Sequence, residues 1–242
     1  MKDAARSPRQ LASRDPAAID TPRIYIITDR RAAGCRWNEL PDRLDGLLSG
    51  LPGEAPDGAV AVQLREKDLS DRPLLSLAAS LRDVTRNHRC ALFINERLDI
   101  ALAVDADGVH LPERGLDIPS VRSVAGPTLA IGVSTHSPSA AVHAARAGAA
   151  LILLSPIWAT PSKAAYGAPL GPQALADVRS QLPTAPILAL GGVTTPARIA
   201  HAVRAGAHGI AGIRLFMQSQ DPPRTIADTW ALIRRQLAEN RP

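Results

Sequence analysis

Short apolar runs recur along the chain, and longer segments rich in Ala and Leu, with polar residues at helical spacing, separate them. We count eight such runs. The predicted strands are residues 23–28, 60–64, 91–94, 108–111, 128–133, 151–154, 187–190 and 209–213. Helices are expected between them, most clearly at residues 138–147, 172–179, 196–205 and 223–238. This alternation is typical of a parallel sheet made of repeated strand–helix units.

A weak internal repeat supports the same architecture. The sequences "DADGVHL", "AGAALIL" and "AGAHGIA" each place a small turn before a short apolar strand. Eight units in about 220 residues predict an α/β fold of the (β/α)8 TIM barrel type, since no GxGxxG turn indicates a doubly wound sheet. We therefore expect one barrel domain at residues 23–242. Residues 1–22 are rich in Ala, Pro and charge without a period, which predicts a disordered N-terminal tail.

Composition excludes several classes of protein. The net charge is +5, but the basic residues are scattered and only 3% of residues are aromatic, so we expect no nucleic acid as a partner. Cys35 and Cys90 form no CxxC pair, which argues against a disulfide framework or a structural zinc. The N-terminal residues lack the apolar core of a secretory signal, and no apolar run is long enough to span a membrane. We expect a cytoplasmic protein with no membrane partner. The sequence is compatible with a monomer or a homo-oligomer.

The segment "QLREK" places charges of both signs where a buried strand should end. Residues two apart in an extended chain share a face, so Gln63, Arg65 and Lys67 are expected on one side. Leu64 and Glu66 would then point to the other side. Because barrels carry their active sites at the C-terminal ends of the strands, the two cations would project over the mouth. The alternative is a solvated strand end in which Glu66 neutralises its neighbours.

Two further segments after predicted strands carry groups suited to phosphate. Asn95 and Glu96 follow the third strand. The loop "SPIWATPSK" after the sixth strand brings Thr160, Ser162 and Lys163. Hydroxyl, backbone N–H and lysine groups bind phosphate oxygens, although any loop rich in Pro, Ser and Gly supplies them.

A glycine pair follows the seventh predicted strand. Gly191 and Gly192 in "LALGGVT" would let backbone amides approach an anion closely, and Thr194 or Thr195 would cap a helix whose Pro196 suits the first turn. Phosphate sites in barrels often use the loops after strands seven and eight. A plain tight turn is the alternative.

One of the six histidines follows a predicted strand, where a proton carrier would lie. The sequence "GVSTHS" places Ser134 and His136 at the mouth, where His136 would either move protons near neutral pH or cap the next helix. His110 lies within the fourth strand, which favours a hydrogen-bonded core histidine. The remaining histidines are expected at the surface, namely His88, His143, His201 and His208.

As an ordered set, these motifs resemble a known family. The set is "YIITD", "QLREK", "FINERLDIALAVDADGVHL", "IGVSTHS", "SPIWATPSK", "LALGGVT" and "AGAHGIAGI". In this order it resembles the thiamine-phosphate synthases and their close relatives, the thiazole tautomerases, both of which are (β/α)8 barrels. The likeness runs from Ile24 to Phe216, and any one motif alone would be weak.

The resemblance implies a transferase with two small-molecule partners, an aminopyrimidine diphosphate and a thiazole phosphate. Diphosphate leaves the pyrimidine methyl carbon, and the thiazole nitrogen attacks that carbon, so the protein must hold the diphosphate and align the thiazole. The implied catalytic residues are Lys163, Ser134 and His136. The implied diphosphate ligands are Arg65, Lys67, Asn95 and Lys163, with Gln63 and Ser134 near the pyrimidine. The implied thiazole phosphate ligands are Thr160, Ser162, Gly191, Gly192, the amides around Ile213, and Arg214.

The chain departs from the family pattern at the metal. Synthases hold Mg²⁺ with two acidic residues, and here Glu96 fills the first place, one methylene longer than the usual Asp. Gly115 stands where the second acid belongs, with Glu113 nearby as a substitute. One carboxylate would suffice, because Mg²⁺ often combines few carboxylates with substrate phosphates. Arg214 replaces a small hydroxyl residue, and it would either add a bidentate phosphate contact or crowd the site.

Two other functions compete with the synthase. The "LP" turn and the missing acid resemble a tautomerase, in which His136 would shift a proton on a thiazole carboxylate phosphate without a metal. Lys67, Lys163 and "GVSTHS" favour the synthase, because a tautomerase has no diphosphate for the lysines to hold. The altered metal turn also suggests a third function, a barrel that binds thiazole or thiamine phosphate without turnover.

Overall fold

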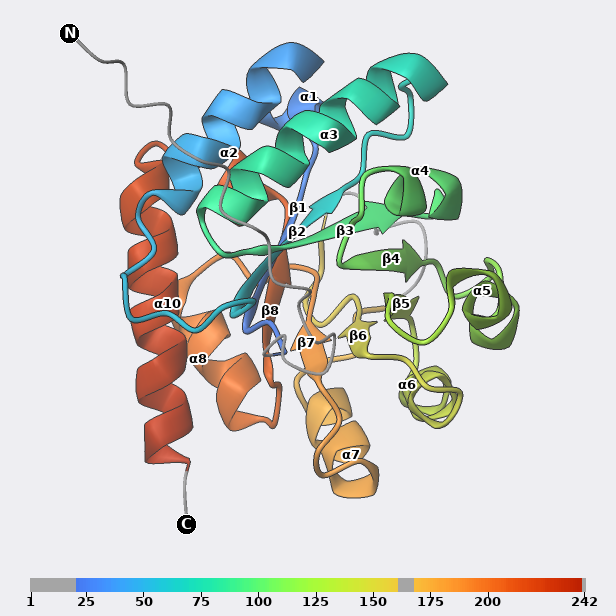
Figure 1. Ribbon diagram of the computed structural model, residues 1–242. Helices are drawn as coiled ribbons and strands as arrows, with labels where there is room; N and C mark the ends of the chain where they lie inside the picture. Colours follow the sequence, from blue (N-terminus) through green and yellow to red (C-terminus); the bar gives the residue numbers. More distant parts are fainter. Residues whose placement is uncertain (1–20, 161–167, 241–242) are drawn as a thin grey trace, which may run out of the picture.

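The computed structural model describes residues 21–160 and 168–240, and eight parallel strands in this part of the chain close into a barrel (Figure 1). Strand β1 pairs with both β2 and β8, so Tyr25 lies beside Ala61 on one side and Ala211 on the other. The strands are β1 (Ile24–Ile27), β2 (Val60–Leu64), β3 (Ala91–Asn95), β4 (Gly108–Leu111), β5 (Ala130–Thr135), β6 (Leu151–Leu154), β7 (Ile187–Ala189) and β8 (Gly209–Gly212). The predicted fold class is therefore confirmed.

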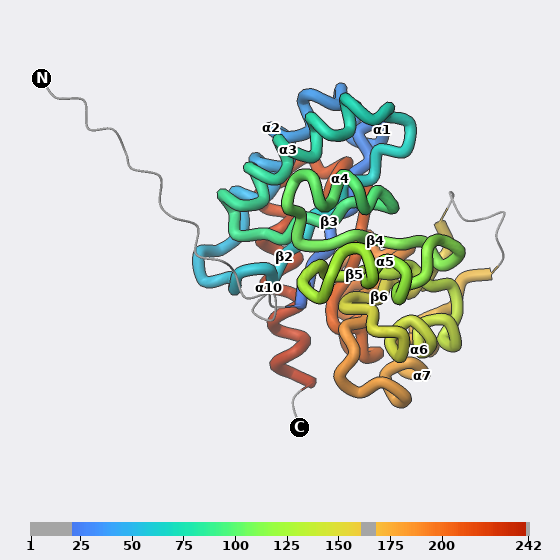
Figure 2. The backbone as a smooth tube through the Cα atoms, turned by 45° about the vertical axis from the view of Figure 1, so that its right-hand side comes forward, coloured from blue at the N-terminus to red at the C-terminus, as the bar shows by residue number. Residues whose placement is uncertain are grey.

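Helices connect the strands and surround them. The helices are α1 (Arg30–Ala33), η2 (Trp37–Glu39), α2 (Leu40–Leu48), α3 (Asp71–Asn87), α4 (Leu98–Ala103), α5 (Ile118–Ala125), α6 (Pro138–Arg146), α7 (Gln173–Gln181), α8 (Pro196–Arg204), α9 (Arg214–Met217) and α10 (Pro222–Glu239). Helices α2 and α3 cover one side of the barrel, and α6 and α7 cover the opposite side (Figures 1 and 2).

Capping side chains explain where several helices begin. Ser137 and Thr195 accept hydrogen bonds from the first turns of α6 and α8, and a proline starts each helix. The cap at Thr195 was predicted, whereas the alternative that His136 caps α6 is wrong, because Ser137 takes that place. Helix α7 begins one residue later than expected because Pro172 is its N-cap. No helix within residues 21–160 and 168–240 has the length and apolar character that crossing a bilayer requires.

The core has two layers, and the alternation of β2 shows how they arise. Val62 and Leu64 pack outward in the large cluster between strands and helices. Ala61 points inward, where it joins the smaller cluster that fills the barrel with Tyr25 and Phe93. Gln63 shares the inward face of Ala61 but lies nearer the C-terminal end of the strand. The pleat therefore directs this polar side chain to the barrel mouth.

Candidate active site

Four polar side chains from neighbouring strands meet at the C-terminal end of the barrel. Gln63 Nε2 donates to Asn95 Oδ1 at 3.3 Å, and His110 Nε2 lies 2.9 Å from Ser134 Oγ. Asn95 and His110 are direct partners in the β3–β4 ladder. We call Gln63, Asn95, His110 and Ser134 the polar floor. The prediction that His110 is a hydrogen-bonded core histidine is confirmed, but its partner Ser134 places it in the site as well.

A buried tyrosine fixes the hydrogen-bond direction in this floor. Tyr25 Oη lies 3.1 Å from His110 Nδ1, and burial raises the pKa of Tyr25 well above its usual value. Burial, aided by the charge of Arg65, lowers the pKa of His110 to about 3, so the imidazole is neutral near pH 7. Because a buried hydroxyl needs an acceptor, the tyrosine donates to Nδ1. Nε2 then donates to Ser134, whose own hydroxyl hydrogen is left for a ligand.

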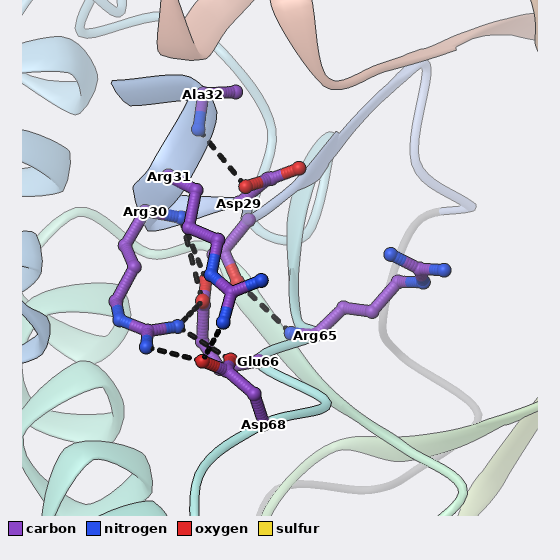
Figure 3. A network of polar contacts seen from close by, with 8 residues as sticks. Asp29, Arg30, Arg31, Ala32, Arg65, Glu66 and Asp68 are labelled. Carbon is purple, nitrogen blue, oxygen red and sulfur yellow. Dashed lines mark hydrogen bonds and ion pairs between the residues drawn. The ribbon is translucent and has the colours of Figure 1, made fainter. Parts of the chain in front are cut away.

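In the segment that follows Gln63, the basic side chain of Arg65 and the acidic side chains of Glu66 and Asp68 point to different sides. The Arg65 backbone N–H donates to Thr28 Oγ1 at 2.9 Å, and its side chain extends away from the carboxylates of Glu66 and Asp68 (Figure 3). Arg65 forms no ion pair with any residue that the structure describes. Glu66 instead pairs with Arg30 at 2.9 Å. The alternative in which Glu66 neutralises its sequence neighbours is therefore wrong.

Lys67 and Glu96 meet at the rim above the floor. Lys67 Nζ lies 3.3 Å from Glu96 Oε2, and Asn95 Nδ2 donates to the same oxygen at 2.8 Å. Glu96 has a φ of 60°, a left-handed conformation that is uncommon for this residue type. The contact between Lys67 and Glu96 joins the segments that follow β2 and β3, which the motifs predict to lie side by side at the mouth.

The loops after β6, β7 and β8 enclose a second region, a pocket of about 120 Å³. Gly191 and Gly192 line it with φ values of 92° and 69°. Within the described chain, the backbone N–H groups of Gly192, Val193 and Ile213 donate no hydrogen bond. Unpartnered amides of this kind attract an anion. The other predicted lining residues, Thr160 and Arg214, also contribute to the pocket.

An arginine and a tryptophan hold the glycine turn in place. Arg198 Nη1 donates to the Gly192 carbonyl at 2.8 Å, and its guanidinium lies 5.5 Å from the centre of the Trp158 ring. A β-carbon on Gly192 would come within 2.7 Å of Trp158 Cβ. The turn therefore requires glycine for both its φ value and its space. Trp158 lies within the motif "SPIWATPSK" and Arg198 follows the glycine turn, but neither residue was predicted for the site.

His136 lies at the edge of the mouth, between the ends of β5 and β6. Its backbone N–H donates to Glu113 Oε2 at 2.6 Å, and Nδ1 lies 2.8 Å from the Ser155 carbonyl. Because a carbonyl only accepts, Nδ1 carries the hydrogen and Nε2 is the basic nitrogen. Ser162 and Lys163, also predicted for the site, lie outside the described residues.

The acidic groups near the mouth are few. Glu113 is engaged by the His136 backbone, and Gly115 offers no carboxylate. No three His, Cys, Asp or Glu side chains come together in residues 21–160 and 168–240. Glu96 is the carboxylate at the rim beside Lys67, and Asn95 donates its amide Nδ2–H to it while Oδ1 accepts from Gln63. A single carboxylate suits Mg²⁺ only together with oxygens from a ligand.

Comparisons with known proteins agree with this geometry. The model of a family described as thiamine monophosphate synthase matches residues 24–216. The chain is 43% identical over 199 residues to a Geobacter sulfurreducens protein provisionally named a thiamine-phosphate synthase, covering 82% of this chain and 88% of that protein. It is 39% identical over 199 residues to the thiamine-phosphate synthase of Roseiflexus castenholzii, covering 82% of both.

A solved structure shares the arrangement of the whole barrel. The thiamine phosphate pyrophosphorylase from Pyrococcus furiosus matches with a TM-score of 0.73 at 27% identity, covering 89% of this chain and 96% of that one. The sequence motifs, the polar floor and these likenesses lead to one assignment. The chain belongs to the thiamine monophosphate synthase family.

Proposed function

We propose that this protein is a thiamine-phosphate synthase, which joins an aminopyrimidine diphosphate to a thiazole phosphate and releases diphosphate. The observation that carries the proposal is the pair of anion-binding regions at one end of the barrel. Arg65 and Lys67 rise after β2, the amides of the glycine turn follow β7, and the polar floor lies at the same end. A reaction that combines a diphosphate and a monophosphate requires two such regions.

The first region would receive the diphosphate of the pyrimidine substrate. The carbon–oxygen bond to the pyrimidine methyl carbon breaks, and its electron pair stays on the leaving diphosphate. Arg65, Lys67, Asn95 and Lys163 would stabilise the growing negative charge, which is where fixed cations lower a barrier most. Arg65 is well suited because no described carboxylate competes for its guanidinium.

The polar floor would hold the pyrimidine ring. Gln63 offers an amide, and Ser134 offers a hydroxyl hydrogen directed by His110 and Tyr25. The floor is neutral because His110 is uncharged near pH 7. A neutral floor lets the pyrimidine cation form beside it without repulsion from an imidazolium.

The pocket after β6, β7 and β8 would hold the thiazole phosphate through Thr160, Ser162 and the amides of Gly191, Gly192 and Ile213. Arg214 is the one charged side chain among the described residues that line the pocket, and it would add a bidentate contact. With the phosphate held, the thiazole nitrogen faces the pyrimidine carbon and donates its lone pair to form the carbon–nitrogen bond.

Glu96 would hold Mg²⁺ together with oxygens of the bound diphosphate. The ion would neutralise charge on the leaving group. The protein's own part is to place one carboxylate next to Lys67, with the Asn95 amide N–H donating to that carboxylate.

A direct assay tests the proposal. Purified protein is incubated with the aminopyrimidine diphosphate, the thiazole phosphate and Mg²⁺, and thiamine phosphate and diphosphate are quantified. We expect both products from the wild type and a loss of at least roughly 100-fold in kcat for Lys163→Ala and Arg65→Ala, since each removes a charge that acts on the leaving group.

Other outcomes point to the competing functions. Aromatisation of a carboxythiazole phosphate that His136→Ala abolishes, without thiamine phosphate formation, would contradict the synthase and identify an isomerase. Tight binding of thiazole phosphate with neither activity would identify a binding protein. Unchanged turnover in Lys163→Ala would refute the role of that lysine.

A further inference from the structure

The buried carboxylate of Glu66 ties the end of β2 to the start of α1. Its side chain is 3% exposed, and both oxygens accept from the Arg30 backbone N–H, at 3.1 and 3.4 Å. Arg30 Nη1 also donates to Oε2 at 2.9 Å. A carboxylate buried to this degree needs such partners, because an unpaired one would be strongly destabilising. Glu66 therefore fixes the backbone between Arg65 and Lys67.

Asp68 extends the contact with α1 two residues further along the chain. It accepts from Arg30 Nη1 and Nη2, each at 2.6 Å, and from Arg31 Nη2 at 2.7 Å (Figure 3). The hydrogen bond from Arg30 lowers the pKa of Asp68 well below its usual value, so it stays ionised at neutral pH. We call Arg30, Arg31, Glu66 and Asp68 the rim clamp. None of its four members lines the pocket after β7 and β8.

The rim clamp holds the acidic side chains of residues 63–68 on the side of α1, away from the basic ones. Even-numbered Glu66 and Asp68 contact α1, whereas odd-numbered Gln63, Arg65 and Lys67 contact or approach the mouth. The two carboxylates would cancel the charges of Arg65 and Lys67 if all four shared one side. Because Arg30 and Arg31 occupy these two carboxylates, Arg65 has no ion pair within the described residues, and Lys67 pairs with Glu96 at the rim instead.

We propose that Glu66 and Asp68 are positioning residues for diphosphate binding, which hold Arg65 and Lys67 over the barrel mouth by their contacts with Arg30 and Arg31. The inference rests on the proposed function, since it concerns the region assigned to the diphosphate. It assigns the two negative charges of residues 63–68, Glu66 and Asp68, a role of their own. They raise the affinity for an anion although their charge alone opposes it.

Electrostatics and positioning predict opposite changes in diphosphate affinity, so the direction of the change tests the inference. Glu66→Gln and Asp68→Asn each remove a negative charge close to Arg65 and Lys67, so simple electrostatics predicts tighter diphosphate binding. Positioning predicts weaker binding, because the freed segment must be ordered again when the anion binds. Inorganic diphosphate with Mg²⁺ is the probe, and calorimetry gives its Kd.

We expect the Kd for diphosphate and the KM for the pyrimidine substrate to rise roughly tenfold in Glu66→Gln and by a smaller factor in Asp68→Asn. The KM for the thiazole phosphate should stay within about twofold of wild type, since its pocket lies on the other loops. A general loss of structure would change both KM values, so the split between substrates separates positioning from folding.

Asp105→Asn is the matched control. Asp105 also meets two arginines, with Arg86 Nη2 at 2.7 Å and Arg82 Nη2 at 4.0 Å, but it precedes β4 at the opposite end of the barrel. Its diphosphate Kd should equal that of the wild type. A diphosphate Kd in both rim-clamp variants that equals or falls below the control value would overturn the inference.

The test remains decisive if one variant does not fold or if the wild type lacks synthase activity. If Glu66→Gln does not fold, Asp68→Asn decides, because its carboxylate is 36% exposed and leaves the core intact. If the wild type forms no thiamine phosphate, the proposed function fails, while the Kd for inorganic diphosphate still tests the rim clamp.

Discussion

His110 shows how burial sets the chemistry of a single residue. Its ring lies between the hydroxyls of Tyr25 and Ser134, and it packs 5.6 Å from the centre of the Tyr25 ring. Both neighbours are neutral, so nothing there compensates an imidazolium. The low pKa of His110 follows from this desolvation, and the neutral ring serves as a relay between two hydroxyls.

This pKa makes the folded protein sensitive to mild acid. The unfolded chain binds a proton at this histidine below about pH 6.5, whereas the folded chain binds it only near the folded pKa of about 3. The free energy of unfolding therefore falls as the pH drops between these values, by at most about 1.4 kcal/mol per pH unit. Urea unfolding at about pH 7 and about pH 5 should show roughly 1 to 2 kcal/mol more loss in the wild type than in His110→Gln.

The remaining histidines are present in both proteins and cancel in this comparison. Equal losses for wild type and His110→Gln would contradict the low pKa of His110. So would an NMR titration in which the His110 ring protonates near pH 6.5 in the folded state.

At the residue scale, the sequence predicts the side to which a side chain points better than the residue that it contacts. The alternation of "QLREK" predicts that Gln63 and Arg65 face the mouth, because the pleat of a strand has a fixed period of two. It does not predict that Tyr25 reaches His110, since 85 positions separate them and their contact depends on how the barrel closes. The pairing of Glu66 with Arg30 escaped prediction for the same reason.

At the element scale, the glycine turn after β7 depends on its neighbour after β6. Trp158 occupies the space beside Gly192, and Arg198 bonds to the Gly192 carbonyl. Gly192→Ala adds a β-carbon against Trp158 at a φ of 69°, so the turn must shift and its amides must turn away from the pocket. We expect the KM for thiazole phosphate to rise at least roughly tenfold, measured by steady-state kinetics with the pyrimidine substrate saturating.

Gly148→Ala is the control for this prediction. Gly148 has a φ of 95° but nothing within 4 Å of the added β-carbon, and it lies in the turn between α6 and β6, away from the mouth. It carries the strain of a positive φ without the collision. A similar KM in both variants would mean that the contact with Trp158 does not shape the pocket.

The ends of the elements show what local sequence signals miss. β5 begins at Ala130 rather than at residue 128, because Arg122 Nη1 binds the carbonyls of Gly126 and Leu129 and holds the preceding turn. β3 extends to Asn95, one residue beyond the predicted end, through its ladder with His110. The β3 shift arises from a partner in another segment, which periodicity within a window does not include, and the β5 shift arises from a local side-chain contact with backbone carbonyls, which hydrophobic periodicity does not describe.

At the scale of the whole molecule, the order of the eight units was predictable, whereas their register was not. Repeated strand–helix units determine that the strands are parallel and that their C-terminal ends share one side. The register between β1 and β8, which closes the barrel, depends on contacts between the two ends of the fold. Closure brings Tyr25 of β1 to His110 of β4, so the completeness of the site depends on it.

One glycine makes this closure possible. A β-carbon on Gly209 of β8 would collide with the carbonyl oxygen of Arg23, which accepts the Ile210 N–H at 2.9 Å where the barrel closes. Gly209→Ala should therefore lower the free energy of unfolding by about 3 kcal/mol or more, because backbone on both sides of the seam must move. Gly46→Ala, in α2 with nothing within 4 Å, should instead raise it by about 0.5 to 1 kcal/mol. Urea unfolding followed by circular dichroism measures both, and a Gly209→Ala protein as stable as the wild type would show that the seam between β1 and β8 has room to adjust.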